Sequence, residues 1–268
     1  MHTGSMKNLT AEKYAFVSPY TQSKDIEKVC KSNNVPTDFI FHEGVWSSAP
    51  HYESCPFRVG RAIEEFTHVL EYAMAANARV VYASSSSIYN GLPTPHKEKQ
   101  VPKITSLYTE ARIGMERMSK FYWENFGVES IGLRYFSVYG RKEKWKGKCA
   151  NLISQFVWAM QKKEAPLIYG DGSQTRDFIH VSDVVEANIL ASEKGKPGEV
   201  YNVGTGRSYS LNDVVREIGD ILPDMAPNYI ENTSKNYVQH TLADTKKTEK
   251  DLGFRAKISL KKGILDIL

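Results

Sequence analysis

Short apolar runs alternate with helical segments through the first half of the chain, and this alternation limits the possible folds more than any other feature. The strand-like runs lie at 14–18, 38–42, 79–83 and 129–136, and the helical patterns at 23–31, 57–76 and 108–126. Such alternation is typical of a parallel sheet with helices on both faces. The sequence therefore predicts an α/β fold with a doubly wound parallel sheet, in which the apolar run 38–42 is a buried strand.

The alternation loosens beyond Gly140, which indicates a second, smaller lobe. The predicted elements there are helices at 151–162, 182–193 and 211–222 and strands at 166–169 and 199–204. We expect a sheet domain at 7–140 and a ligand-binding lobe at 141–268 that is partly interleaved with the sheet.

Charge and cysteine content exclude several classes of partner. The 268 residues carry 35 basic and 31 acidic side chains, a net charge of +4, without a dense basic run, so nothing points to nucleic acid. Cys30, Cys55 and Cys149 lack the spacing of a zinc site or a disulfide framework and are typical of a reducing compartment. No apolar run reaches the ~18 residues of a membrane span. We therefore expect a cytoplasmic, soluble protein without a membrane or metal partner, and mild basicity suits an anionic small ligand.

Tyr108 and Arg112 lie four positions apart at the start of a helical run, so they share one face of the helix. A free tyrosine loses its proton near pH ~10, and a neighbouring cation favours the phenolate. The pair is therefore suited to act as a base near neutral pH. From this stretch alone, a half-buried tyrosine beside a surface arginine is the favoured interpretation, because single pairs of this kind are common.

Polar residues follow three of the predicted strands, where ligands bind in open parallel sheets. They are His42-Glu43-Gly44, the four serines Ser84–Ser87, and Tyr135–Ser137. A serine hydroxyl beside a tyrosine can bind a substrate oxygen, although a serine-rich turn also satisfies its own backbone. Arg176 follows a Gly-Asp-Gly turn and suits either a phosphate or an ion pair with Asp177 or Asp183.

Seven motifs in order give the chain a resemblance to a known family. They are His42-Glu43-Gly44-Val45, Ser84-Ser85-Ser86-Ser87-Ile88-Tyr89-Asn90-Gly91, Tyr108-x-x-x-Arg112, Leu133–Gly140, Gly170-Asp171-Gly172 with Arg176–Val184, Tyr201–Gly204, and Ala243-Asp244-Thr245-x-Lys247. From about residue 14 to 254 the sequence resembles the extended short-chain dehydrogenase/reductases, in particular the nucleotide-sugar epimerases and dehydratases. It looks most like the UDP-glucose 4-epimerase group.

The resemblance implies a Rossmann-like fold, NAD as cofactor, a UDP-sugar as substrate and a homodimer formed through the helices at 57–76 and 108–126. It implies catalytic roles for Ser85, Tyr108 and Arg112. The residues that it implies for the cofactor are Glu43, Gly44, Val45, Tyr108, Arg112 and Tyr135. Those that it implies for the substrate are Ser87, Ser137, Asn151, Leu152, Tyr169, Arg176 and His240. Tyr108 would take the proton of a sugar hydroxyl while hydride passes to NAD, and the 4-keto intermediate would rotate before it is reduced again.

The sequence departs from the family at four places. Arg112 stands where the family has lysine, Ser137 where it usually has asparagine, and His240 where a second phosphate-binding arginine is expected. The largest departure is the first strand-helix-strand unit with its G-x-x-G-x-x-G loop, which is missing, since Gly4 is the only glycine before Gly44. Strand 14–18 would then either pair directly with 38–42 or leave the edge of 38–42 open.

Three functions fit these observations. The first is an NAD-dependent nucleotide-sugar epimerase, with UDP-glucose and UDP-galactose as the expected pair. The second is a catalytically inactive relative that binds nucleotide sugars without NAD. The third is a truncated piece of an active epimerase. Ser86 and Ser87 occupy the positions of the Asp-Glu pair usual in 4,6-dehydratases, which argues against dehydration.

Overall fold

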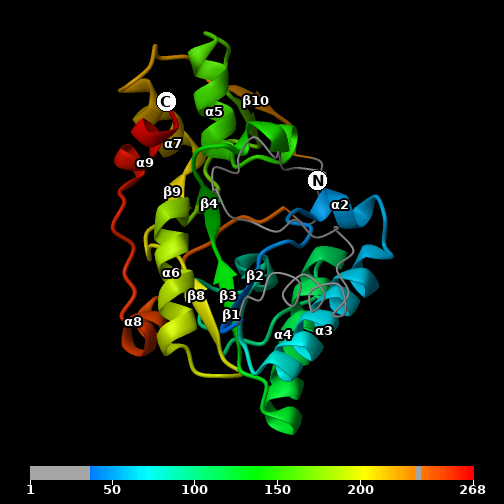
Figure 1. Cartoon of the computed structure of the whole chain (residues 1–268). Helices are drawn as coiled ribbons and strands as arrows, with labels where there is room; N and C mark the ends of the chain where they lie inside the picture. The colour runs from blue at the N-terminus through cyan, green and yellow to red at the C-terminus, as the bar shows by residue number, and fades with distance from the viewer. Residues whose placement is uncertain (1–36, 233–236) are drawn as a thin grey trace.

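The computed structural model describes residues 37–232 and 237–268 (Figure 1). Its main sheet has four parallel strands in the order β1 (Phe39–His42), β2 (Arg79–Ser85), β3 (Ser130–Tyr135) and β8 (Val200–Val203). The register pairs Ser85 with Tyr135, so the residues at the carboxyl ends of these two strands lie side by side. The predicted strand 14–18 and helix 23–31 lie outside the described residues.

Helices cover both faces of this sheet. On one face lie α3 (Arg58–Ala76) and α4 (Leu107–Phe126), which share an apolar core with β2 that includes Phe66, Leu70, Tyr82 and Met115. On the other face lie α6 (Val181–Lys194) and α8 (Lys246–Leu252), packed on Val81, Ile131 and Leu133 from the strands. The predicted doubly wound α/β fold is confirmed.

Helix α4 begins and ends at strong local signals. Ser106 and Thr109 form a reciprocal capping box, in which each side chain accepts a hydrogen bond from the backbone N–H of the other. Gly127 ends the helix with a φ of 71°, a conformation that costs glycine little. These caps fix the first turn of α4, which carries Tyr108.

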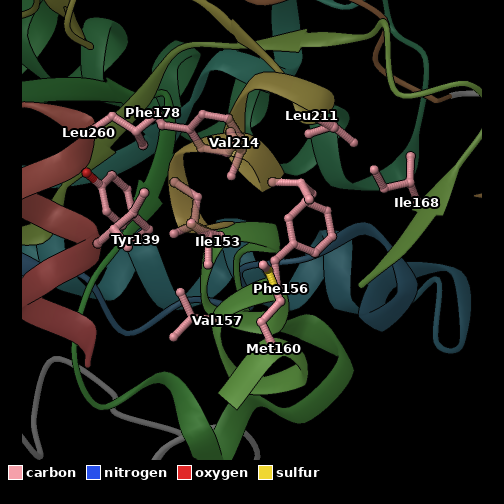
Figure 2. Packing of buried hydrophobic residues seen from close by; sticks show 13 residues of the cluster. Tyr139, Ile153, Phe156, Val157, Met160, Ile168, Phe178, Leu211, Val214 and Leu260 are labelled. Carbon is pink, nitrogen blue, oxygen red and sulfur yellow. The ribbon is translucent and has the colours of Figure 1, made fainter. Parts of the chain in front are cut away.

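A second apolar core lies beyond the sheet (Figure 2). It packs α5 (Leu152–Gln161), α7 (Leu211–Gly219) and α9 (Leu260–Ile267) around Tyr139, Phe156, Ile168 and Phe178. The remaining elements are α2 (Ala49–Glu53), η2 (Ser86–Tyr89), β4 (Ser137–Tyr139), η3 (Glu143–Cys149), β5 (Leu167–Tyr169), β6 (Thr175–Arg176), β7 (Phe178–His180), β9 (Tyr209–Ser210) and β10 (Asn228–Ile230).

The two predicted lobes share chain segments. After β4, η3, α5 and β5–β7, the chain returns to the sheet as α6 and β8, and then runs back to the second core as α7. This order agrees with interleaved lobes, whereas the boundary at residue 140 stays a prediction. None of the described helices has the length and apolar content needed to cross a membrane.

Strand β1 forms as predicted, but the expectation that it is buried is wrong. Phe39 and Phe41 are 48% and 46% exposed. They alternate with the less exposed Ile40 and His42, as expected of a strand with one face packed on the protein and the other open. Within residues 37–232 and 237–268, β2 is the only strand that pairs with β1. Whether strand 14–18 pairs there stays a prediction.

Candidate active site

A pocket of about 480 Å³ opens where the carboxyl ends of β2 and β3 meet the second lobe. It brings together nine residues that the sequence nominated, namely Glu43, Val45, Ser85, Ser87, Tyr108, Arg112, Tyr135, Ser137 and Asn151. Gly44 stands between two of these lining residues but does not itself line the pocket. The clustering follows from the parallel sheet, which places successive strand ends along one edge.

Ser85 ends β2 and caps the short helix η2. Its Oγ accepts a hydrogen bond of 3.1 Å from the backbone N–H of Ser87, so the hydroxyl proton is left to donate elsewhere. The neighbouring Ser84 turns to α4 and donates to Glu116 Oε1 at 2.5 Å. Ser85 therefore lines the pocket with a hydroxyl proton that can bond a ligand oxygen.

Tyr108 lies in the first turn of α4 and is 9% exposed. Its ring centroid lies 5.6 Å from that of Tyr52, and the Arg112 guanidinium carbon lies 5.0 Å from the centroid of the Tyr108 ring. The ring is thus held between an aromatic and a cation, as expected for a cation–π contact. This packing fixes the phenol at the wall of the pocket that also holds Ser85.

Arg112 is 2% exposed and lies in the wall of the pocket. One guanidinium nitrogen donates to the carbonyl of Ala83 at 3.0 Å and another to that of Trp46 at 2.8 Å, whereas buried Nε has no hydrogen-bond partner among the described residues. No described carboxylate forms an ion pair with Arg112 within 4.0 Å. The guanidinium therefore ties α4 to β2 and to the segment after β1 and brings a buried positive charge to the pocket wall.

Glu43 and Tyr135, which line the pocket, form a hydrogen-bonded cluster with Asn188. The Tyr135 hydroxyl donates to Glu43 Oε1 at 3.0 Å and accepts from Asn188 Nδ2 at 2.8 Å. Burial raises the pKa of Tyr135 well above its usual value, so its hydroxyl keeps its proton and acts as a donor. Asn188, on α6, had no local signal in the sequence.

The Glu43 carboxyl titrates closer to neutrality than an ordinary glutamate. Surrounding protein atoms raise the pKa of Glu43 to about 6, against smaller lowering effects of the Tyr135 hydrogen bond and of Arg112. The neighbouring His42 is affected in the opposite way, since burial and then Arg112 lower its pKa to about 4. Near neutral pH the pocket therefore holds a carboxylate that gains a proton at mild acidity, while the imidazole of His42, which stacks on Phe66, is neutral.

The Glu43 titration predicts a pH-dependent difference in stability between the protein and its Glu43→Gln variant. Because the folded-state pKa of Glu43 is raised from 4.5 to about 6, its protonated carboxyl stabilises the fold fully below pH 4.5, and this contribution is lost as pH rises through 6. In urea unfolding, the free energy of unfolding of Glu43→Gln should increase by up to ~1 kcal/mol relative to that of the parent as pH rises across this window. Solvent screening limits this amount. The His42 contribution is common to both proteins and cancels. A constant difference from pH 4.5 to 7 would contradict the prediction.

The start of α5, predicted to bind a phosphate, is already occupied by an internal carboxylate. Glu143, 7% exposed, accepts from Ser154 Oγ at 2.5 Å and from the Asn151 N–H at 3.3 Å, and pairs with Lys146 at 3.0 Å. Asn151 caps the helix through Ile153 N at 3.0 Å. Asn151 nevertheless lines the pocket, whereas Leu152 packs against the second apolar core. Sequence reasoning missed Glu143 because nothing local marks it.

Tyr169, Arg176 and His240 lie together but outside the residues that line this pocket. Gln174 donates to the Tyr169 carbonyl and to the Tyr237 hydroxyl, and the Arg176 guanidinium carbon lies 5.3 Å from the centroid of the Tyr237 ring. His240 Nδ1 lies 3.0 Å from Thr175 Oγ1.

Arg176 donates to two backbone carbonyls, those of Thr175 and Gln239, and forms no ion pair within 4.0 Å among the described residues. The alternative of an ion pair with Asp177 or Asp183 is therefore wrong. Both aspartates instead accept backbone N–H groups, from Ala243 and from Lys257 respectively.

Comparisons with known proteins match these observations. Residues 6–204 match the family described as the NAD dependent epimerase/dehydratase family. A putative UDP-glucose 4-epimerase from Methanocaldococcus jannaschii is 30% identical over 98% of this chain and 85% of its own length.

Two solved structures have the same fold. The UDP-glucose 4-epimerase of Thermotoga maritima, solved with UDP-glucose, superposes with a TM-score of 0.89 at 27% identity over 98% of this chain and 85% of its own. The UDP-N-acetylglucosamine 4-epimerase of Methanobrevibacter ruminantium M1, solved with UDP-N-acetylmuramic acid, superposes with a TM-score of 0.89 at 28% identity over 99% of this chain and 87% of its own. The family match, the fold and the order of the motifs agree, and this chain belongs to the NAD-dependent epimerase/dehydratase family.

Proposed function

We propose that this chain is a nucleotide-sugar 4-epimerase that interconverts UDP-glucose and UDP-galactose. The observation that carries the proposal is the meeting of Ser85, Tyr108 and Tyr135 in one pocket, from two strand ends and the first turn of α4. The relatives named for UDP-sugar epimerisation support the substrate class.

The described residues fit the nicotinamide end of NAD. Glu43, Val45 and Tyr135 offer polar and apolar contacts on one wall, and Arg112 brings a buried positive charge whose Nε lacks a partner among the described residues. The sequence before Gly44 holds no glycine-rich loop for the pyrophosphate. When bound, NAD would accept hydride from the sugar and return it.

The protein residues would manage protons and orientation. Tyr108 Oη would take the proton of the sugar 4-hydroxyl as its carbon is oxidised, and would return it when the keto group is reduced. Ser85, which already accepts from Ser87 N, would donate its own proton to the same substrate oxygen. Ser87, Ser137 and Asn151 would contact the sugar, with the diphosphate and base directed toward Arg176, His240 and Tyr169.

A nucleotide-sugar-binding protein without NAD is the second candidate function. The specific observation in its favour is the absence of the G-x-x-G-x-x-G motif from the sequence. The third interpretation, a piece of a longer active epimerase, shares this observation. Homodimerisation through α3 and α4 and a cytoplasmic location stay predictions. Exposed apolar side chains on α4, among them Phe121 and Phe126, suit the dimer.

Denaturing the purified chain and identifying what is released tests the proposal. We expect NAD by absorbance and mass, or its uptake when it is added, followed by conversion of UDP-galactose to UDP-glucose. If calorimetry shows UDP-glucose binding while NAD neither co-purifies nor binds, the second function replaces the first. A chain that binds neither would overturn both for this sequence.

A further inference from the structure

Cys149 and His51 meet at the wall of the pocket from positions 98 residues apart in the chain. Cys149 Sγ lies 3.9 Å from His51 Nε2, within hydrogen-bonding range for sulfur. The cysteine ends η3, is half-buried and lines the pocket together with Ser48. The thiol therefore has both an adjacent base and access to a small molecule in the pocket.

His51 is held in place by its own neighbours. It lies in α2, is 8% exposed, and its Nδ1 is 3.1 Å from Ser48 Oγ. When Nδ1–H donates to Ser48, Nε2 presents its lone pair toward the thiol of Cys149. A nucleophile, a base in contact with it and a third group that orients the base make up the usual arrangement of an activated cysteine.

The surroundings of the pair hold His51 in place and leave the thiol open to the pocket. Arg58, on α3, donates from its guanidinium to the carbonyl of His51. Lys146, on η3, lines the same pocket as Cys149, and its charge is paired with Glu143. A partly open thiol in contact with an imidazole is the kind of arrangement in which cysteines become reactive.

We propose that Cys149 and His51 form an activated thiol that undergoes exchange with small-molecule disulfides inside the pocket. The Cys149 proton passes to His51 Nε2, and the sulfur attacks one sulfur of the disulfide. The new Cys149 S–S bond forms as the old S–S bond breaks, and the leaving thiolate takes the proton from His51. Cys149 is oxidised and the disulfide is reduced. The adduct fills part of the pocket, and a free thiol reverses the step.

The reduced 268-residue chain can be tested by timed reaction with iodoacetamide and with 2-hydroxyethyl disulfide, scored for each cysteine by peptide mass spectrometry. Cys55 is an internal control, because it is also half-buried and its sulfur makes no hydrogen bond to the described residues. At pH 6.5 we expect Cys149 to react about tenfold faster than Cys55.

Two variants separate the role of the imidazole from simple exposure. His51→Asn should bring the Cys149 rate to within about twofold of that of Cys55. Ser48→Ala, which leaves His51 in place, should slow Cys149 by a smaller factor and provides the test if His51→Asn does not fold. Equal rates for the two cysteines in the parent protein, or an unchanged Cys149 rate in a folded variant without the imidazole, would overturn the proposal. This outcome does not depend on epimerase activity.

Discussion

Replacing Tyr108 with phenylalanine should lower kcat for UDP-galactose by about 10²- to 10⁴-fold, the usual contribution of a positioned acid–base group. The change removes the phenolic oxygen and leaves the ring. That ring keeps its contacts with Tyr52 at 5.6 Å and with the Arg112 guanidinium at 5.0 Å, so the first turn of α4 should keep its place. KM should change little, because the phenolic oxygen acts in proton transfer and not in substrate binding.

The control for this experiment is Tyr52→Phe. Tyr52 is fully buried beside Tyr108, and burial raises its pKa to about 12, so it stays protonated throughout the working range. Its hydroxyl bonds only the Trp46 carbonyl among the described residues, at 3.3 Å. Removal of that hydroxyl should leave kcat within about threefold of the parent, since one neutral hydrogen bond is lost away from the substrate. Parental activity in Tyr108→Phe would exclude Tyr108 as the base.

The largest expected effect on stability comes from Glu116→Leu. Arg134 donates to both carboxylate oxygens of Glu116, at 2.9 and 2.7 Å, with side chains 5% and 12% exposed. Without the carboxylate, Arg134 keeps only the Tyr89 hydroxyl and the Glu98 carbonyl as hydrogen-bond partners among the described residues, and it stays buried and charged. Urea unfolding should show a loss of about 3–5 kcal/mol, as for other buried ion pairs that lose one partner.

An ion pair on the same helix supplies the comparison. Lys120 and Glu124 lie 3.7 Å apart at the surface of α4, with side chains 67% and 58% exposed. Lys120→Ala should change the free energy of unfolding by less than about 0.5 kcal/mol, because exposed pairs are screened by water. A loss below ~1 kcal/mol in Glu116→Leu would mean that water reaches Arg134 and that the pair is not enclosed.

The sequence predicted those parts of the fold and site that depend on local periodicity and on strand ends. Helix α4 begins and ends within one residue of the prediction because its caps are local signals. Ser85 and Tyr135 were expected together because parallel strands end at one edge, whereas the family resemblance placed Tyr108 with them, and all three line the pocket.

The rest depends on contacts between distant segments. No pattern shows that the Arg112 side chain turns inward to the carbonyls of Ala83 and Trp46, since an arginine four residues from a tyrosine can equally face solvent. The approach of His51, on α2, to Cys149, at the end of η3, is a contact between segments 98 residues apart and has no sequence signal. The exposure of Phe39 and Phe41 reflects the place of β1 in the described sheet, which composition cannot reveal.

The interleaved path of the chain has a consequence for protein engineering. A cut at residue 140 would deprive the first fragment of strand β8 and of the helix α6 that covers one face of its sheet, while the second fragment would carry both without a sheet to pack on. Each fragment would expose a large apolar surface. The two halves are therefore poor modules for transplantation, and a hybrid with a relative should exchange segments at loops within one lobe.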